Sequence, residues 1–75
     1  MKKRLKEAHK NWHHRKPTSI GGISEDRNMS HVSTSRHQAW HTLFGNKSAY
    51  EISAIINHDW LDPDYLLIVV RREGT

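Results

Sequence analysis

The clearest periodic pattern lies in the second half of the chain, where apolar side chains recur at the spacing of a helical turn. The stripe consists of Ile52, Ile55, Ile56 and Trp60. Apolar residues at this spacing line one face of an α-helix, so we expect the whole stripe, its tryptophan included, to pack in the core. Ser48 and Glu51 form a capping box that predicts the start of the helix. The helix should end near Leu61, ahead of Pro63.

A second helix is predicted over residues 36–44. Ser35 is the expected N-cap, and Gln38 stands three positions later, which completes a capping box. Gly45 follows the last helical position, as is common at helix C-termini. The apolar surface of this helix would come from Ala39, Trp40, Leu43 and Phe44. We expect the tryptophan to be a core residue rather than a platform for stacking on a base.

Three other segments are predicted to be extended. Residues 11–16 lead towards Pro17, and residues 28–32 alternate polar and apolar side chains, which is typical of a half-buried strand. The stretch 17–27 between them is rich in serine, glycine and charge, and it predicts a loop. Residues 66–70 are apolar and mostly β-branched, and they predict a buried C-terminal strand. Whether a homodimer contact runs through that strand is left open by the sequence.

Five polar residues stand out by type and order: His13, His14, Asn28, His37 and His41. His37 and His41 are four positions apart, so on a helix they face the same way. Neutral imidazoles are good ligands for borderline metals, and three histidines with an open position are typical of a catalytic metal site. Taken alone, the helical pair is more often an exposed pair without a ligand. The ordered set of five favours a metal site.

This ordered set resembles the HNH family of nucleases, also called the His-Me finger or ββα-metal fold, in the version found in DNA-cleaving colicins. The likeness covers residues 12–45. A histidine pair, His13–His14, ends a strand, a Gly21–Gly22 loop follows, Asn28 opens a second strand, and a helix carries His-x-x-x-His. The resemblance implies an α+β fold with a ββα-metal core. The helix and the strand predicted after residue 45 would be additions to that core.

The resemblance also implies a role for each motif residue. His14 would be the general base that takes a proton from water. The metal ligands would be His13, His37 and His41. Asn28 would be part of the catalytic site, either because it ties down the loop and so fixes the base or because it contacts the metal. The cofactor would be one divalent cation, with zinc or nickel favoured in binding and magnesium or manganese able to support turnover.

The length of 75 residues allows one small domain, of the size that a metal or an oligomeric contact often stabilises. The expected parts are a basic arm (1–11), the motif (12–45) and a completing helix and strand (46–75). The chain has no cysteine, which excludes disulfides and a cysteine zinc knuckle. Residues 66–70 form the longest apolar run, which is far too short to span a membrane.

Positive charge is concentrated at the start of the chain. The formal net charge is +4, and seven of the twelve basic residues lie within the first sixteen positions. No apolar run follows them, so the arm is not expected to be a signal peptide. It would form a short helix over residues 2–10 that either binds a phosphate backbone or is simply a solvated tail. The expected contacts to nucleic acid are Lys10, Arg15, Lys16 and Arg36.

The sequence therefore favours a metal-dependent endonuclease that hydrolyses DNA phosphodiester bonds with little sequence specificity, in the cytoplasm of a bacterial or phage-infected cell. No membrane partner is expected, and a larger protein complex is a candidate partner. The first alternative is a catalytically silent HNH-like protein that binds and inhibits another protein, for example a host defence nuclease. A weaker alternative is a zinc module that binds nucleic acid without cleaving it. Loss of His14 distinguishes these functions, because only the enzyme needs a base.

Overall fold

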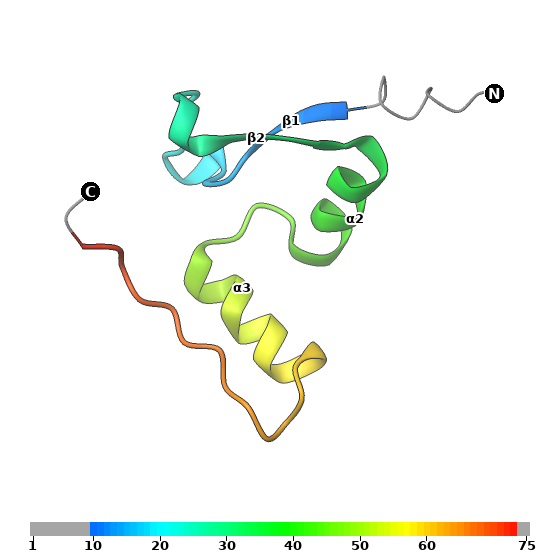
Figure 1. Cartoon of the computed structure of the whole chain (residues 1–75), viewed down its shortest axis with the longest axis vertical. Helices are drawn as coiled ribbons and strands as arrows, with labels where there is room; N and C mark the ends of the chain where they lie inside the picture. Colours follow the sequence, from blue (N-terminus) through cyan, green and yellow to red (C-terminus); the bar gives the residue numbers. More distant parts are fainter. Residues whose placement is uncertain (1–9, 74–75) are drawn as a thin grey trace.

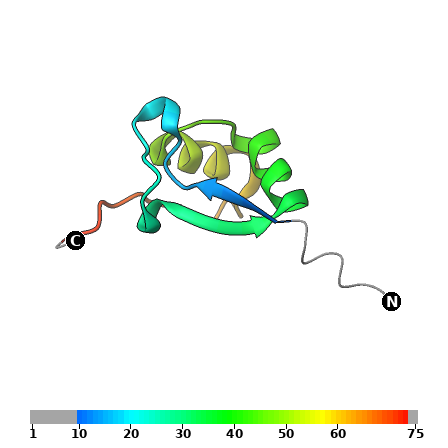
Figure 2. The same ribbon diagram turned by 90° about the horizontal axis from the view of Figure 1, so that it is seen from above.

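The structure is a computed structural model that describes residues 10–73. Within this range the chain runs through β1 (Lys10–His14), the 3₁₀ turns η1 (Thr18–Ile20) and η2 (Asp26–Asn28), and β2 (Met29–Ser33). It continues as α2 (Thr34–Phe44), α3 (Ala49–Ile55) and the π-helical turn η3 (Ile56–Trp60). The strands form a hairpin, and both helices lie on one side of it (Figure 1, Figure 2). The predicted α+β class is confirmed. Residues 2–9 of the helix predicted over residues 2–10 lie outside the described residues, and Lys10 begins β1 instead.

The hairpin and the helix that follows it have the order strand, loop, strand, helix. β1 pairs antiparallel with β2, with Asn11 opposite Val32 and His13 opposite Ser30. The two strands predicted in this region are confirmed, although β1 ends at His14 and β2 begins one residue later than expected. Because side chains alternate along a strand, Asn11 and His13 lie on the same face. The described residues thus form a small α+β domain with a ββα layout.

Two glycines allow the loop between the strands to turn tightly. Gly21 has a φ of 101°, in the left-handed region that glycine adopts without a steric cost. A Cβ atom on Gly22 would lie 1.8 Å from the carbonyl oxygen of Lys16, so no larger residue fits there. The Gly22 N–H instead donates to the carbonyl of Pro17 at 2.8 Å. Both glycines are therefore needed for the loop that follows His14, as the sequence predicted.

Helix α2 begins two residues earlier than the sequence predicted, and the prediction of Ser35 as its N-cap is wrong. The N-cap is Ser33, whose extended backbone (φ −64°, ψ 148°) ends β2 and whose hydroxyl accepts from the Arg36 N–H at 3.2 Å. An N-cap serine satisfies one of the free N–H groups of the first turn. A serine at either position could cap the helix. Ser33 is the N-cap because β2 ends there and the helix begins at the next residue.

Helix α3 begins as predicted but ends in an irregular turn. The side chain of Ser48 accepts from the Glu51 N–H at 3.2 Å, and the Glu51 carboxylate accepts from the Ser48 N–H at 2.9 Å, which confirms the capping box. The C-cap is Leu61, as predicted, but its N–H bonds to the carbonyl of Ile56 at 2.8 Å, five residues back.

No helix of the described residues is long and apolar enough to cross a membrane.

The core is smaller than the sequence predicted. Among residues 10–73, Phe44 is the one apolar side chain that is buried, and Trp40 is half-buried beside it. Trp60 is 63% exposed, so its assignment to the core is wrong. The wider π-helical turn takes more residues per turn than an α-helix, which rotates Trp60 away from the stripe that begins at Ile52. The three isoleucines of the stripe are half-buried.

The predicted C-terminal strand at residues 66–70 is also wrong. This segment forms neither a helix nor a strand, and it runs away from η3 as an open coil (Figure 1). A strand is defined by its backbone hydrogen bonds to another strand. Within residues 10–73, no strand lies beside residues 66–70. Within the described part of the chain, the backbone of this segment is hydrogen-bonded only at Leu67, where the side chain of Asn57 bonds both the N–H and the carbonyl.

Candidate metal centre

Three histidine side chains converge between β1 and α2. His13 comes from the end of β1, and His37 and His41 lie one turn apart on α2, so the strand and the helix each supply part of the site. One ring nitrogen of each residue lies within 4.8 Å of those of the other two. The Nε2 atoms of His37 and His41 are 3.1 Å apart. Two nitrogen ligands of one tetrahedral zinc are separated by roughly the same distance. The three histidines lie close enough to bind one metal ion.

His13 has the electronic state that a metal ligand needs. Its Nδ1 is buried and is the one buried side-chain polar atom in the described part of the chain that has no hydrogen-bond partner. Burial, and then the neighbouring imidazoles of His37 and His41, lower the pKa of His13 below its usual value. The ring is therefore neutral at pH 7, and a buried polar nitrogen without a partner is unfavourable. A neutral ring with an unpartnered nitrogen has the chemistry expected of a metal ligand.

Asn11 orients one of the helical ligands, and the sequence did not reveal this. Nδ1 of His37 lies 3.3 Å from Oδ1 of Asn11. The amide oxygen only accepts, so Nδ1 is the protonated nitrogen and Nε2 keeps its lone pair for the metal. Such outer contacts commonly fix the orientation of a ligand histidine. Because Asn11 stands two positions before His13 on the same face of β1, strand alternation was the signal that could have identified it.

His14 lies beside the cluster of His13, His37 and His41 rather than within it. A cavity of about 150 Å³ is lined by Trp12, His13, His14, Pro17, Thr18, His37, His41 and Asn46. Both histidines of the pair reach it because the strand ends at His14. Nε2 of His14 lies 2.9 Å from the hydroxyl of Ser24, a loop residue that the sequence reasoning missed. The hydroxyl can hold the ring while Nδ1 remains free.

Asn28 ties the loop to the end of β1. Its Oδ1 accepts from the N–H of Lys16 at 2.7 Å, and its Nδ2 donates to the carbonyls of Lys16 at 3.1 Å and Ile23 at 2.9 Å. The side chain is therefore fully engaged with backbone groups on both sides of the loop. Of the two roles that the sequence left open, this geometry fits the one that fixes the loop.

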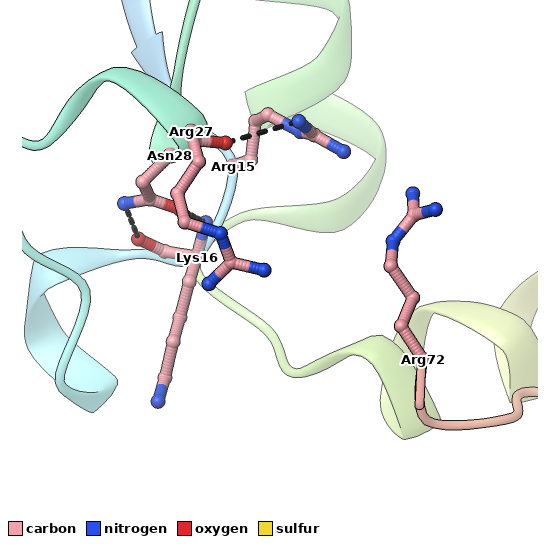
Figure 3. Close-up of a pocket in the computed structure, with 5 residues that line it drawn as sticks. All are labelled: Arg15, Lys16, Arg27, Asn28 and Arg72. Carbon is pink, nitrogen blue, oxygen red and sulfur yellow. Dashed lines mark hydrogen bonds between the residues drawn. The ribbon is translucent and has the colours of Figure 1, made fainter. Parts of the chain in front are cut away.

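Asn28 and Lys16 also line a basic cavity. Its volume is about 460 Å³, and it is lined by Arg15, Lys16, Arg27, Asn28 and Arg72. Arg15 is held by a 3.0 Å bond from its Nη1 to the carbonyl of Arg27, and Arg72 faces the others across the opening (Figure 3). No acidic side chain of residues 10–73 lines the cavity. Four cationic groups without a counter-charge suit a phosphate.

The structure brings only some of the predicted nucleic-acid contacts together. Arg15 and Lys16 share the basic cavity, where Arg27 and Arg72 join them. Arg36 instead lines a separate, mostly apolar cavity of about 250 Å³ beside His13 and His37. Lys10 is exposed at the start of β1. The sequence did not indicate Arg27 and Arg72 because neither stands near the motif histidines. The turn of η2 brings Arg27 to the basic cavity, and the path of the last segment brings Arg72 there.

Comparisons with protein-family models, with curated proteins and with solved structures found no match for this chain. The likeness to the HNH family therefore rests on the types, order and placement of the residues themselves.

Proposed function

We propose that this chain is an HNH-type, metal-dependent endonuclease that hydrolyses DNA phosphodiester bonds with little sequence specificity. The observation that carries the proposal is the convergence of His13, His37 and His41 within 4.8 Å, with His14 on the wall of the same cavity. Three nitrogen ligands leave a position open for water or a phosphate oxygen, which is the usual arrangement of a catalytic site. A closed structural site would need a fourth protein ligand.

The roles of the residues follow from their contacts. In the tautomer whose Nε2–H donates to Ser24, the Nδ1 lone pair of His14 is free to take a proton from water. The oxygen of that water attacks phosphorus, the bond to the 3′ oxygen breaks, and solvent protonates the departing oxygen. When bound, a divalent cation at this site supplies Lewis-acid stabilisation of the charge that grows on the phosphate. Asn28 keeps the loop, and with it Ser24, in place.

The ligand atoms favour zinc or nickel as the tightly bound ion. Imidazole nitrogen suits these borderline metals, whereas magnesium and manganese prefer oxygen ligands. No carboxylate belongs to the group of three ligands within the described residues. Magnesium or manganese would therefore bind more weakly here, although either could support turnover at millimolar concentration. The metal that binds most tightly and the metal that supports the fastest cleavage need not be the same.

The basic cavity supports a nucleic-acid substrate. Arg15 and Lys16 directly follow His14 in the chain and share a cavity with Arg27, so these cations would hold a phosphate of the strand that enters the site. Contacts to phosphate carry no base information, which accounts for cleavage with little sequence preference. Binding through such contacts weakens steeply as the salt concentration rises.

The test is nicking of supercoiled plasmid by metal-stripped protein, with magnesium, manganese, nickel and zinc added in turn. Loss of a general base typically lowers the rate by about 10²–10⁴-fold, so His14→Ala should lose nicking by that factor while it still binds metal. His37→Ala should lose both metal binding and nicking. His58→Ala is the matched control, because His58 is exposed on η3 and should leave both properties unchanged.

Two results would contradict the proposal in different ways. Normal nicking by His14→Ala would show that another group is the base. A folded protein that binds metal but nicks with none of the four ions would favour the catalytically silent alternative, in which the same scaffold binds another protein. Metal binding is measured separately by calorimetry, so a failure of chemistry is distinguished from a failure to load the site.

A further inference from the structure

The last described segment exposes an unusual amount of apolar surface. The exposed fraction is 70% for Tyr65, 70% for Leu66, 45% for Leu67, 70% for Ile68 and 77% for Val70, while Val69 between the last two is half-buried. Single exposed apolar residues are common on protein surfaces, but a contiguous run of them marks an interaction site. Strands that are apolar on both faces are typical of the interior of sheets. The segment has the composition of a buried strand without the neighbours of one.

One edge of this segment is already occupied. The side-chain amide of Asn57 donates to the carbonyl of Leu67 at 2.9 Å and its oxygen accepts from the Leu67 N–H at 2.8 Å. These are the two bonds that a neighbouring strand would make to the same residue. The N–H and the carbonyl of one extended residue point to the same side, and those of the next residue point to the opposite side.

The opposite edge is open. In an extended segment the same alternation directs the backbone groups of Leu66, Ile68 and Val70 away from Asn57. Within residues 10–73, none of these three residues has a backbone hydrogen bond. An open edge beside exposed apolar side chains is a template for pairing with another strand. The occupant should therefore be an extended apolar segment of similar length.

We propose that this occupant is the same segment of a second copy of the chain, paired antiparallel about a two-fold axis at Ile68. In that register the two Ile68 residues exchange backbone hydrogen bonds, and Leu66 of each copy lies opposite Val70 of the other. These are the residues whose backbone groups face the open edge. The hydrogen-bonded positions of an antiparallel ladder recur at every second residue, so the register satisfies all of them together.

Charge at the two ends of the segment selects this partner and this register. Asp64 precedes the apolar run and Arg72 follows it. With the axis at Ile68, Asp64 of each copy faces Arg72 of the other, which gives two opposite-charge pairs. A register shifted by one step places Asp64 opposite Val70, with Asp62 opposite Arg72, or places Leu66 opposite Arg72, so each shift sets a charged side chain against an apolar one. The segment is thus complementary to itself, and cross-strand pairs of this kind stabilise a ladder.

The contact is small, so the dimer should form reversibly and depend on concentration. A single pair of short strands buries less surface than the standard interface of about 1,600 Å². Sedimentation velocity over a concentration series, with a chelator present to exclude metal bridging, should show the weight-average mass rise from that of the monomer towards that of the dimer. A monomer at every concentration would overturn the proposal.

Charge reversal tests the register. Asp64→Lys and Arg72→Asp each place two like charges opposite one another, so each variant alone should dimerise about tenfold more weakly than the unchanged chain. A mixture of the two variants restores both opposite-charge pairs and should recover dimerisation. Arg71→Asp changes the net charge by the same amount as Arg72→Asp but lies opposite Tyr65, so it should have a smaller effect.

The outcomes separate the proposal from its rivals and from the nuclease activity. Recovery in the mixture supports self-pairing in this register, and equal weakening by Arg71→Asp, or no recovery in the mixture, overturns it. The circular dichroism of each variant shows whether the helices are intact, which is expected because the segment is an exposed coil. Self-pairing should persist in His14→Ala, so it can hold even if the nuclease proposal fails.

Discussion

At the scale of single residues, the orientation of the His37 ring depends on an amide outside the histidine motif. Asn11 accepts from Nδ1 of His37, which leaves Nε2 directed at His41. Asn11→Ala removes that acceptor and should lower the affinity for zinc by about 10–100-fold. Asn11→Asp keeps an acceptor and should retain the affinity. Competition with a chelating dye measures both values, and equal affinity of the alanine variant and the unchanged chain would contradict this role.

The residues of the candidate site differ in how far the sequence reveals them. His13, His37 and His41 follow from spacing, since four positions on a helix and the end of a strand are local features. Asn11 shares a strand face with His13, but the spacing does not show that it contacts His37, and Ser24 is not marked by any spacing to the histidines. Their roles arise from the approach of α2 to β1 and from the fold of the loop, which only the three-dimensional arrangement supplies.

At the scale of elements, the junction between β2 and α2 allows a direct comparison of two serines. Ser33→Ala removes the hydroxyl that accepts from the Arg36 N–H and should lower the free energy of unfolding by about 1 kcal/mol. Ser35→Ala lies within the first turn of the helix and should change it by much less. Urea unfolding followed by circular dichroism measures both. A larger loss of unfolding free energy in Ser35→Ala than in Ser33→Ala would instead identify Ser35 as the N-cap that the sequence predicted.

The elements that the sequence predicted correctly are those fixed by local chemistry. The capping box of Ser48 and Glu51 and the tight turn at Gly22 depend on residues close in the chain. Two of the errors have other causes. Trp60 does not lie on the same helix face as the isoleucines because η3 winds more loosely than an α-helix. Residues 66–70 form no strand because a strand needs another strand to pair with. An apolar run shows that burial is favourable, but it does not say which surface buries it.

At the scale of the whole molecule, the described part has little apolar interior to stabilise it. Phe44 is the one buried apolar side chain between residues 10 and 73, and the strands form a single hairpin. Two-stranded hairpins are marginal in water, and small domains commonly depend on a metal or on association. Because His13 lies on β1 and its co-ligands on α2, an ion bound there would link the hairpin to the helix. Metal binding and folding should therefore be coupled.

This coupling predicts a metal-dependent Tm that disappears in acid. Zinc at a hundred times its Kd adds about 2.7 kcal/mol, which for a domain of this size raises the Tm by roughly 10–20 °C. Protonated imidazole cannot bind metal, so the rise should be full at pH 8 and lost below about pH 6. Burial, followed by the charges of His37 and His41, lowers the pKa of His13 in the folded chain.

The lowered pKa of His13 also determines how the stability of the metal-free protein changes with pH. As the pH falls below about 6.5, the unfolded chain binds this proton before the folded chain does. The metal-free protein should therefore be most stable above that pH and should lose stability as the pH falls through the folded pKa. Thermal unfolding at pH 8, 7, 6 and 5, with zinc or with a chelator, measures both effects. His37→Ala should show no zinc-induced rise, and an equal Tm with zinc and with chelator at pH 8 in the unchanged chain would show that no ion links β1 to α2.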